Sequence, residues 1–125
     1  MKLLIIDGDS SRQRIVRNIL VSLNHKATEM ESATDTRTAL ISLKQKKHDC
    51  IIVSMKMPDS DGMALVKEIR AGATTQHIPI VVLSAEPSKD NVLLAHQNGA
   101  DAFLGYPCSA ADVEQALTQA LSKKS

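Results

Sequence analysis

Three short, unbroken runs of apolar residues recur along the chain, each bounded by polar or turn-forming residues. They are Leu3–Ile6, Cys50–Val53 and Ile80–Leu83. An unbroken apolar run of this length is typical of a strand buried on both faces, as in a parallel sheet covered by helices on each side. The pattern therefore predicts three central strands of such a sheet. Two weaker segments, His25–Met30 and Asp101–Leu104, are predicted to be its second and fifth strands.

Between these strands, apolar residues recur three or four positions apart, which is the spacing of one face of an α-helix. Ser10 and Gln13 have the spacing of a capping box, which predicts that the first helix begins there. The last helix is predicted to begin at Ser109. The apolar stripes are Ile15, Val16, Ile19, Leu20 and Leu23; Ala39, Leu40 and Leu43; Leu65, Val66 and Ile69; and Val113, Ala116, Leu117, Ala120 and Leu121.

Strands and helices alternate along the sequence, and we expect five of each. This alternation predicts a single α/β domain over residues 1–125, with a parallel sheet and right-handed crossovers. In a doubly wound sheet the functional site lies beyond the carboxyl ends of the strands, where the strand order reverses. The residues expected to gather there are Asp7, Gly8, Asp9, Ser54, Ser84 and Tyr106.

The composition of the chain limits which partners and which cellular compartment we expect. Fifteen Lys and Arg residues against fourteen Asp and Glu residues give a net charge of +1, so no global field attracts the chain to nucleic acid or to an anionic membrane. The apolar run after Lys2 is too short for a signal peptide, and no run approaches the roughly 20 apolar residues of a membrane span. We therefore expect a cytoplasmic protein in which Cys50 and Cys108 are reduced thiols.

The segment Ser54–Gly62, which reads SMKMPDSDG, comes directly after the apolar run Cys50–Val53. It resembles the phosphoacceptor segment of bacterial response-regulator receiver domains. The resemblance extends over Lys2–Leu121 and is closest to the single-domain chemotaxis regulators of the CheY type. It implies a flavodoxin-like three-layer sandwich with five βα units, strand order 2-1-3-4-5, and a role in two-component signal transduction.

Carried over position by position, the resemblance implies a degenerate phosphorylation site. The family's acidic pair falls on Asp7 and Gly8, and its acceptor aspartate falls on Ser54. Forming an acyl phosphate needs a carboxylate nucleophile, a divalent cation on oxygen ligands, and a cation that neutralises the phosphoryl group. We therefore expect no acyl phosphate, no resident cofactor, and weak or absent magnesium binding at the remaining Asp7. Lys56 is placed to form an ion pair with Asp7.

The later positions of the family pattern are changed in part. The conserved Thr or Ser of the fourth strand falls on Ser84, and the aromatic switch of the fifth strand falls on Phe103. The invariant lysine before proline falls on Tyr106, so its charge is missing. The Tyr106–Pro107 bond is expected to be cis, because the family turns the chain with a cis proline at this point. We expect the tyrosine ring to lie over the vacated pocket.

The resemblance also implies where a partner binds. In receivers, the fourth helix, the fifth strand and the fifth helix form the signalling surface, which here includes Lys89, Val92, His96 and Phe103. Because a switch without phosphate has no chemical input, we expect this face to bind another signalling protein constitutively. The favoured function is thus a phosphorylation-independent receiver that acts as a protein interaction module in bacterial signalling, with chemotaxis or motility the nearest setting, and not as an enzyme.

Two alternatives stay open at this point. The first is a conventional response regulator that still accepts phosphate. The second, more remote, is a phosphatase of the haloacid dehalogenase type, because the run Leu4–Ser11 resembles that family's strand and DxD signature, with Asp7 as nucleophile and Asp9 as general acid. No acidic pair follows a later strand to hold the magnesium ion that this chemistry uses.

Overall fold

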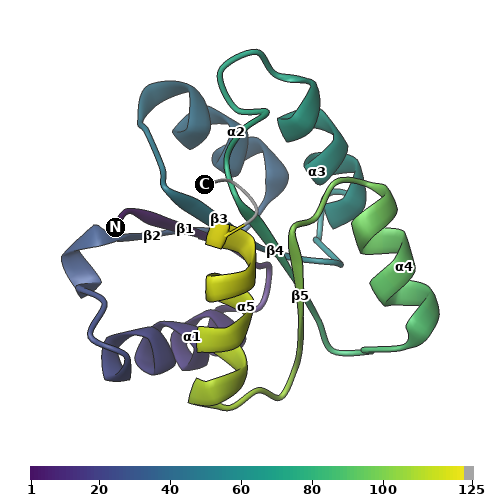
Figure 1. Ribbon diagram of the computed structural model, residues 1–125. Coiled ribbons are helices and arrows are strands. Elements are labelled where there is room, and N and C mark those ends of the chain that lie inside the picture. The colour runs from purple at the N-terminus through teal and green to yellow at the C-terminus, as the bar shows by residue number, and fades with distance from the viewer. Residues whose placement is uncertain (123–125) are drawn as a thin grey trace.

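A computed structural model describes residues 1–122 of the chain. Its five strands form one parallel sheet with the order β2-β1-β3-β4-β5, as predicted (Figure 1). Every residue of β1, β3 and β4 is buried, which explains why these strands appear as unbroken apolar runs in the sequence. The strands are β1 Leu3–Ile6, β2 Met30–Ala33, β3 Cys50–Ser54, β4 Ile80–Ser84 and β5 Ala102–Gly105.

Helices cover both faces of the sheet and complete the predicted three-layer sandwich (Figure 1). Helices α1 and α5 pack on one face, where Val16 and Leu117 belong to one core cluster. Helices α2, α3 and α4 pack on the other face, where Leu43, Val66 and Ala95 belong to a second core cluster. The helices are α1 Ser10–Ser22, α2 Thr36–Gln45, α3 Gly62–Ala71, α4 Lys89–Gln97 and α5 Ala110–Ser122.

The second strand lies later in the sequence than predicted. The segment His25–Met30 is not a strand, because Ala27–Glu29 forms a 3₁₀ turn and only Met30 begins β2. β2 is an edge strand that pairs with β1 from Leu3↔Met30 to Ile6↔Ala33. Its middle residues are polar and only its ends are buried, so it lacks the apolar run that identified the central strands.

The first helix is capped differently from the predicted capping box. Asp9, not Ser10, is the N-cap, and its carboxylate accepts a hydrogen bond from the backbone N–H of Arg12 at 3.0 Å. The side chain of Gln13 turns inward and donates to the backbone carbonyls of Asp7 and Ala33 at 2.8 and 2.7 Å. Gln13 therefore ties α1 to the carboxyl end of β1 and to the end of β2.

The start of the last helix was predicted to within one residue. Helix α5 begins at Ala110, and Ser109 precedes it. The Ser109 hydroxyl accepts from the backbone N–H of Asp112 at 3.1 Å, and the Asp112 carboxylate accepts from the backbone N–H of Ser109 at 3.0 Å. This reciprocal pair of hydrogen bonds satisfies free donors at the beginning of the helix.

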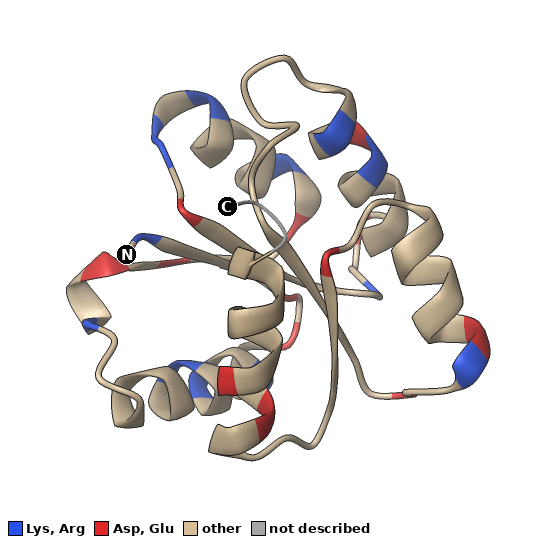
Figure 2. Ribbon diagram, viewed as in Figure 1, with Lys and Arg blue, Asp and Glu red and all other residues tan. Residues whose placement is uncertain are grey.

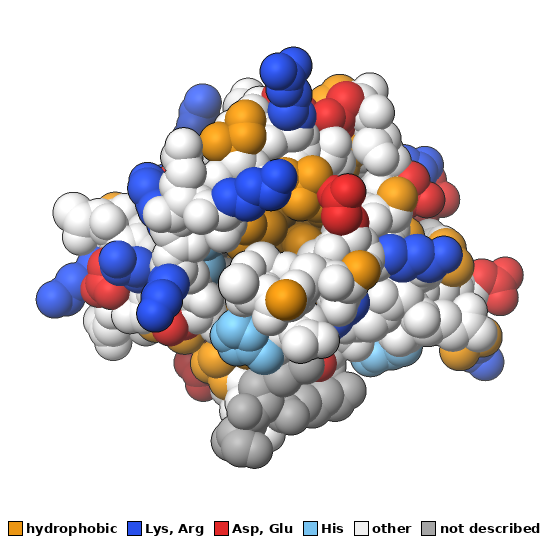
Figure 3. Space-filling view, turned by 90° about the horizontal axis from the view of Figure 1, so that it is seen from above, with side chains coloured by type: hydrophobic (Ala, Val, Ile, Leu, Met, Phe, Trp, Pro, Cys, Tyr) orange, Lys and Arg blue, Asp and Glu red, His pale blue; other side chains and the backbone are white. Residues whose placement is uncertain are grey.

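Charges of both signs are distributed over the helices. Basic residues predominate on α1 and α2, whereas α5 carries acidic residues (Figure 2). Figure 3 shows the molecule from above, where Lys and Arg side chains and an acidic side chain surround a hollow with a hydrophobic floor. None of the helices between Met1 and Ser122 combines the length and the apolar character needed to cross a bilayer.

Candidate functional site

The parallel register brings the predicted polar residues to one edge of the sheet. Ile6 is paired with Val53, Ser54 with Leu83, and Ser84 with Gly105. Asp7 directly follows β1, and Tyr106 directly follows β5. The carboxyl ends of four neighbouring strands therefore meet at the site that the sequence indicated.

An ion pair between Asp7 and Arg12 occupies the centre of this edge. The Asp7 carboxylate is 1% exposed and accepts from Arg12 Nε at 2.5 Å and from Arg12 Nη2 at 2.7 Å, a bidentate arrangement. It also accepts from the backbone N–H of Asp9 at 2.9 Å. The buried carboxylate is thus neutralised by a cation from the first turn of α1.

Arg12 connects this carboxylate to two further residues of the site. Its Nη2 atom donates to Ser54 Oγ at 3.3 Å, and its guanidinium carbon lies 5.8 Å from the centre of the Tyr106 ring. The latter distance is within the range of a cation–π contact. The hydrogen bond to Asp7 raises the pKa of Arg12, although burial acts in the opposite direction.

The ion pair that the sequence suggested between Lys56 and Asp7 is absent, and that prediction was wrong. Lys56 Nζ lies 3.4 Å from Glu86 Oε1, and the Lys56 side chain is 84% exposed. Arg12 already binds both oxygens of Asp7. Lys56 also forms an isolated β-bridge with Asp61 in the loop after β3, and its side chain extends into solvent from there.

Arg12 was missed in the sequence. It stands five residues after Asp7 in the first turn of the predicted helix, where side chains can reach the carboxyl edge of a parallel sheet. The basic residue at this position was the signal in the sequence that could have identified the partner of Asp7. The structure thus assigns to Arg12 the role that the sequence analysis gave to Lys56.

Ser54 and Ser84 are both buried, and each hydroxyl makes internal hydrogen bonds. Ser54 Oγ accepts from Arg12 and donates to the Lys56 carbonyl at 3.1 Å. Ser84 Oγ accepts from the Glu86 N–H at 3.0 Å and donates to the Glu86 carbonyl at 3.1 Å. A serine nucleophile needs an adjacent general base, whereas the charged neighbour of Ser54 is a guanidinium. This geometry leaves Ser54 unactivated.

The residues at this edge do not fit a magnesium ion. Arg12 binds both oxygens of Asp7, which leaves the exposed Asp9, whose Oδ1 already caps α1, as the nearest carboxylate with an open oxygen, whereas magnesium sites of this kind gather several carboxylates. A carboxylate at position 8 is also opposed by packing, because a Cβ atom on Gly8 would lie 2.5 Å from Cδ of Pro58. Between Met1 and Ser122, no three His, Cys, Asp or Glu side chains gather closely enough to hold a metal ion.

The aromatic residues of β5 and the following turn lie on opposite sides of the sheet. The Tyr106–Pro107 peptide bond is cis, as predicted. Tyr106 packs partly buried against the core beneath α1 and α5, and its ring faces Arg12. Phe103 packs partly buried against the core on the other face. The ring therefore lies beside the cation that binds Asp7 and Ser54, and the expectation that it covers the vacated pocket stays a prediction.

The residues expected at the partner face lie on a thinly packed helix. Lys89 and His96 are exposed and Val92 is half-buried, while Ala95 is the only buried residue of α4. Leu93 is 58% exposed on the same helix and was missed in the sequence. His96 Nδ1 lies 3.2 Å from the Ala100 carbonyl, so this histidine also contributes to the end of the helix.

Comparisons with known proteins agree with the architecture. The family model of the response regulator receiver domain matches residues 3–118. The chemotaxis protein CheY-3 of Vibrio cholerae serotype O1 is 34% identical over 117 residues, which cover 94% of this chain and 88% of that protein.

Solved structures of response regulators share the fold of this chain. The chemotaxis response regulator CheY4 of Vibrio cholerae matches with a TM-score of 0.85 and 28% identity over 96% of this chain and 98% of that chain. A putative response regulator from Chloroflexus aurantiacus matches with a TM-score of 0.89 at 23% identity over 97% of each chain, a likeness of fold alone. The family match spans nearly the whole sequence, and the chain therefore belongs to the response regulator receiver domain family.

Proposed function

We propose that this chain is a phosphorylation-independent receiver, a pseudo-receiver that acts as a protein interaction module in bacterial signal transduction. The observation that carries the proposal is the bidentate ion pair between Asp7 and Arg12, whose guanidinium also reaches Ser54. The guanidinium binds the carboxylate that would otherwise hold a metal ion and contacts the residue at the acceptor position. The positive charge of Arg12 and the negative charge of Asp7 cancel, so this ion pair stabilises the structure and leaves no free charge for phosphate chemistry.

Each requirement of acyl phosphate formation is opposed by a specific feature. The acceptor position holds a hydroxyl without a base, at Ser54. The charge of Arg12 is already balanced by Asp7, so it is not free to neutralise a phosphoryl group. Tyr106 provides no cation at the lysine position of the family pattern. The same ion pair disfavours a phosphatase, because Arg12 binds both oxygens of Asp7, the carboxylate that would have to act as the nucleophile.

Phosphorylation is tested with acetyl phosphate and magnesium, followed by intact mass spectrometry. The wild-type chain should gain no phosphoryl group, while a receiver that retains its acceptor aspartate serves as the positive control. Ser54→Asp is the matched variant and should recover little, since Arg12 and Gly8 still prevent metal binding. A hydroxylamine-labile phosphate on the wild-type chain would support a conventional regulator and overturn the proposal.

The proposed partner is another cytoplasmic signalling protein that binds the face formed by α4, β5 and α5, without nucleic acid or membrane. Exposed leucine on α4 supports this assignment, because Leu93 presents apolar surface to solvent beside the charged Lys89. We further propose that the chain is a single domain and not an enzyme. Binding at this face would need no phosphorylation step.

The partner face is tested by affinity capture from the native cell. Lys89→Glu combined with Leu93→Ser should reduce recovery of the partner and leave the circular dichroism spectrum unchanged. His96 is left intact, because it contacts the end of α4 and its replacement would alter the helix itself. Ser54→Ala should capture the partner as wild type does. Loss of capture with Ser54→Ala alone would instead place control at the pocket.

A further inference from the structure

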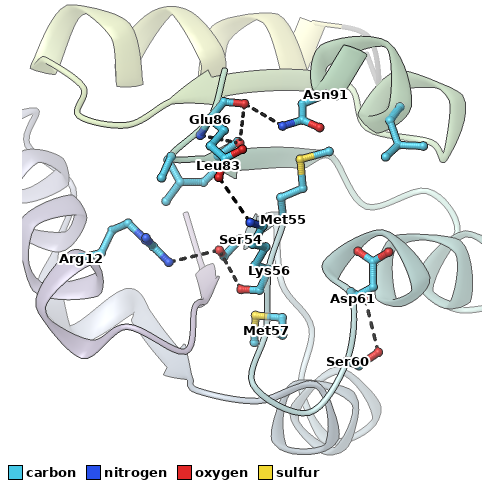
Figure 4. A pocket seen from close by; sticks show the side chains of 13 residues that line it. Arg12, Ser54, Met55, Lys56, Met57, Ser60, Asp61, Leu83, Glu86 and Asn91 are labelled. Carbon is cyan, nitrogen blue, oxygen red and sulfur yellow. Dashed lines mark hydrogen bonds and ion pairs between the residues drawn. The ribbon is translucent and has the colours of Figure 1, made fainter. Parts of the chain in front are cut away.

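A pocket of about 540 Å³ opens between the loop after β3, the end of β4 and the first half of α4 (Figure 4). Its volume falls within the roughly 300–1,000 Å³ range of small-molecule sites. It lies at the carboxyl edge of the sheet, where doubly wound proteins place their ligands. The lining residues of greatest interest are Met55, Asp61, Leu83, Glu86, Asn91 and Leu94.

Much of the pocket lining is apolar and part of it is uncovered. Met55 and Leu83 are buried beneath it, whereas Leu94 on α4 is 42% exposed. In Figure 4 the Met55 side chain reaches toward Asn91, with Asp61 across from it. Methionine side chains adapt to irregular partners and make favourable contacts with aromatic rings. These features suit a ligand with a compact apolar or aromatic body.

Most donor groups around the pocket are already used in internal hydrogen bonds, so the polar atoms that can still bind a ligand are mainly hydrogen-bond acceptors. The hydroxyl hydrogens of Ser54 and Ser84 are directed to backbone carbonyls, and Asn91 Nδ2 donates to the Glu86 carbonyl at 2.7 Å. Within residues 1–122, Asn91 Oδ1 and Asp61 Oδ2 make no hydrogen bond, while Asp61 Oδ1 accepts from the Met63 N–H at 2.9 Å. A ligand that donates hydrogen bonds therefore finds partners here.

The charges of the pocket select among such ligands. Arg12 is balanced by Asp7, and Lys56 is balanced by Glu86 across the exposed rim. Asp61 is the lining carboxylate without an ion-pair partner among the described residues. We propose that this pocket binds a small organic amine with an apolar or aromatic body, its ammonium directed to Asp61 and Asn91. This inference goes beyond the proposed function and does not depend on it.

The five methionines make the proposal directly testable by NMR. The protein is labelled with ¹³C at the methionine methyl groups and titrated with 2-phenylethylamine, with phenylacetate as the anionic counterpart of similar size. Met55 and Met57 line the pocket, whereas Met1 and Met30 pack in the core beneath α1 and α5 and serve as internal controls. The amine should shift the Met55 and Met57 signals with a dissociation constant on the order of 1–10 mM, as expected for a fragment of this size.

Two variants separate the charge from the apolar surface. Asp61→Asn keeps a residue that caps α3 well and removes the charge. It should raise the dissociation constant of the amine by roughly three- to fivefold. Leu94→Gln removes apolar surface without adding a charge at a helix position that is 42% exposed, so the fold is retained, and it should abolish the Met55 shift. Phenylacetate should bind at least about tenfold more weakly than the amine, a difference of about 1.4 kcal/mol.

Four outcomes would overturn the proposal. One is the absence of any Met55 or Met57 shift up to the solubility limit of the amine. Another is an equal response to phenylacetate, which would reject the amine class. The third is an unchanged amine affinity in both Asp61→Asn and Leu94→Gln. A shift of Met1 and Met30 as large as that of Met55 would indicate nonspecific binding and count equally against it.

Discussion

Replacing Arg12 by glutamine tests the energetic basis of the site. The variant keeps the aliphatic stem and a hydrogen-bond donor but removes the charge that balances Asp7. The Asp7 carboxylate is 1% exposed and would keep the backbone N–H of Asp9 as a donor at 2.9 Å, but it would have no cation beside it. A buried charge that has lost its partner destabilises the folded state, so the variant loses free energy of unfolding at neutral pH.

The expected loss in the free energy of unfolding follows from how deeply the ion pair between Asp7 and Arg12 is buried. Removing one partner of a buried ion pair costs about 3–5 kcal/mol, and the lower value applies here because the Arg12 side chain is 18% exposed. A loss of about 3 kcal/mol corresponds to a fall in Tm of roughly 10–15 °C for a domain of this size. Since small domains have about 5–15 kcal/mol of stability, the variant should still fold.

Chemical denaturation of wild type, Arg12→Gln, Asp7→Asn and the double variant gives the coupling energy of the pair. The double variant should recover much of the loss, with a coupling of about 2 kcal/mol, because neither residue is then charged. Lys46→Gln is the control, since Lys46 and Glu31 form an ion pair with a 61% exposed lysine side chain and should contribute about 1 kcal/mol or less. Equal effects of Arg12→Gln and Lys46→Gln would refute the argument that Asp7 depends on a buried cation.

Three further predictions follow from other residues. Ser54→Asp should bind Arg12, which lies 3.3 Å from the Ser54 hydroxyl, and calorimetry should detect no magnesium binding; measurable binding would contradict this. Lys46 and Ser42 lower the pKa of Glu31 from 4.5 to about 2, so its stabilisation is present above about pH 4.5 and lost as the pH falls toward 2. Glu31→Gln should therefore flatten acid unfolding across that window by about 1 kcal/mol after allowance for solvent screening, and parallel curves would contradict it. Burial raises the pKa of Cys50 to about 12, so a thiol reagent should modify the partly exposed Cys108 first and Cys50 only on unfolding; equal rates in the native state would contradict this.

The sequence was informative where burial alone determines local structure. Leu3–Ile6 and Ile80–Ser84 are buried at every position, so their apolar runs identify them as central strands. The edge strand Met30–Ala33 was misplaced because its middle residues face solvent and carry no such signal. The hydrogen-bond partners of polar side chains were harder to predict than the strands. Gln13, for example, donates hydrogen bonds to the carboxyl ends of two strands instead of capping its own helix.

The site was predicted in position but not in its main interaction. Residues that follow strands could be placed at one edge from the fold alone. The partner of Asp7 could not, because choosing between Arg12 and Lys56 depends on side-chain direction after the backbone is fixed. The contact between Gly8 and Pro58 was also beyond sequence reasoning, because it joins residues fifty positions apart through packing of two loops.

The position of Tyr106 has a consequence for spectroscopy. The chain contains one tyrosine and no tryptophan, so its intrinsic fluorescence comes essentially from a single ring. That ring lies beside the guanidinium of Arg12, where α1 meets the turn after β5. Emission from the unmodified protein therefore reports on this one contact rather than on an average over the fold, and separation of Arg12 from the ring can be followed without any attached dye.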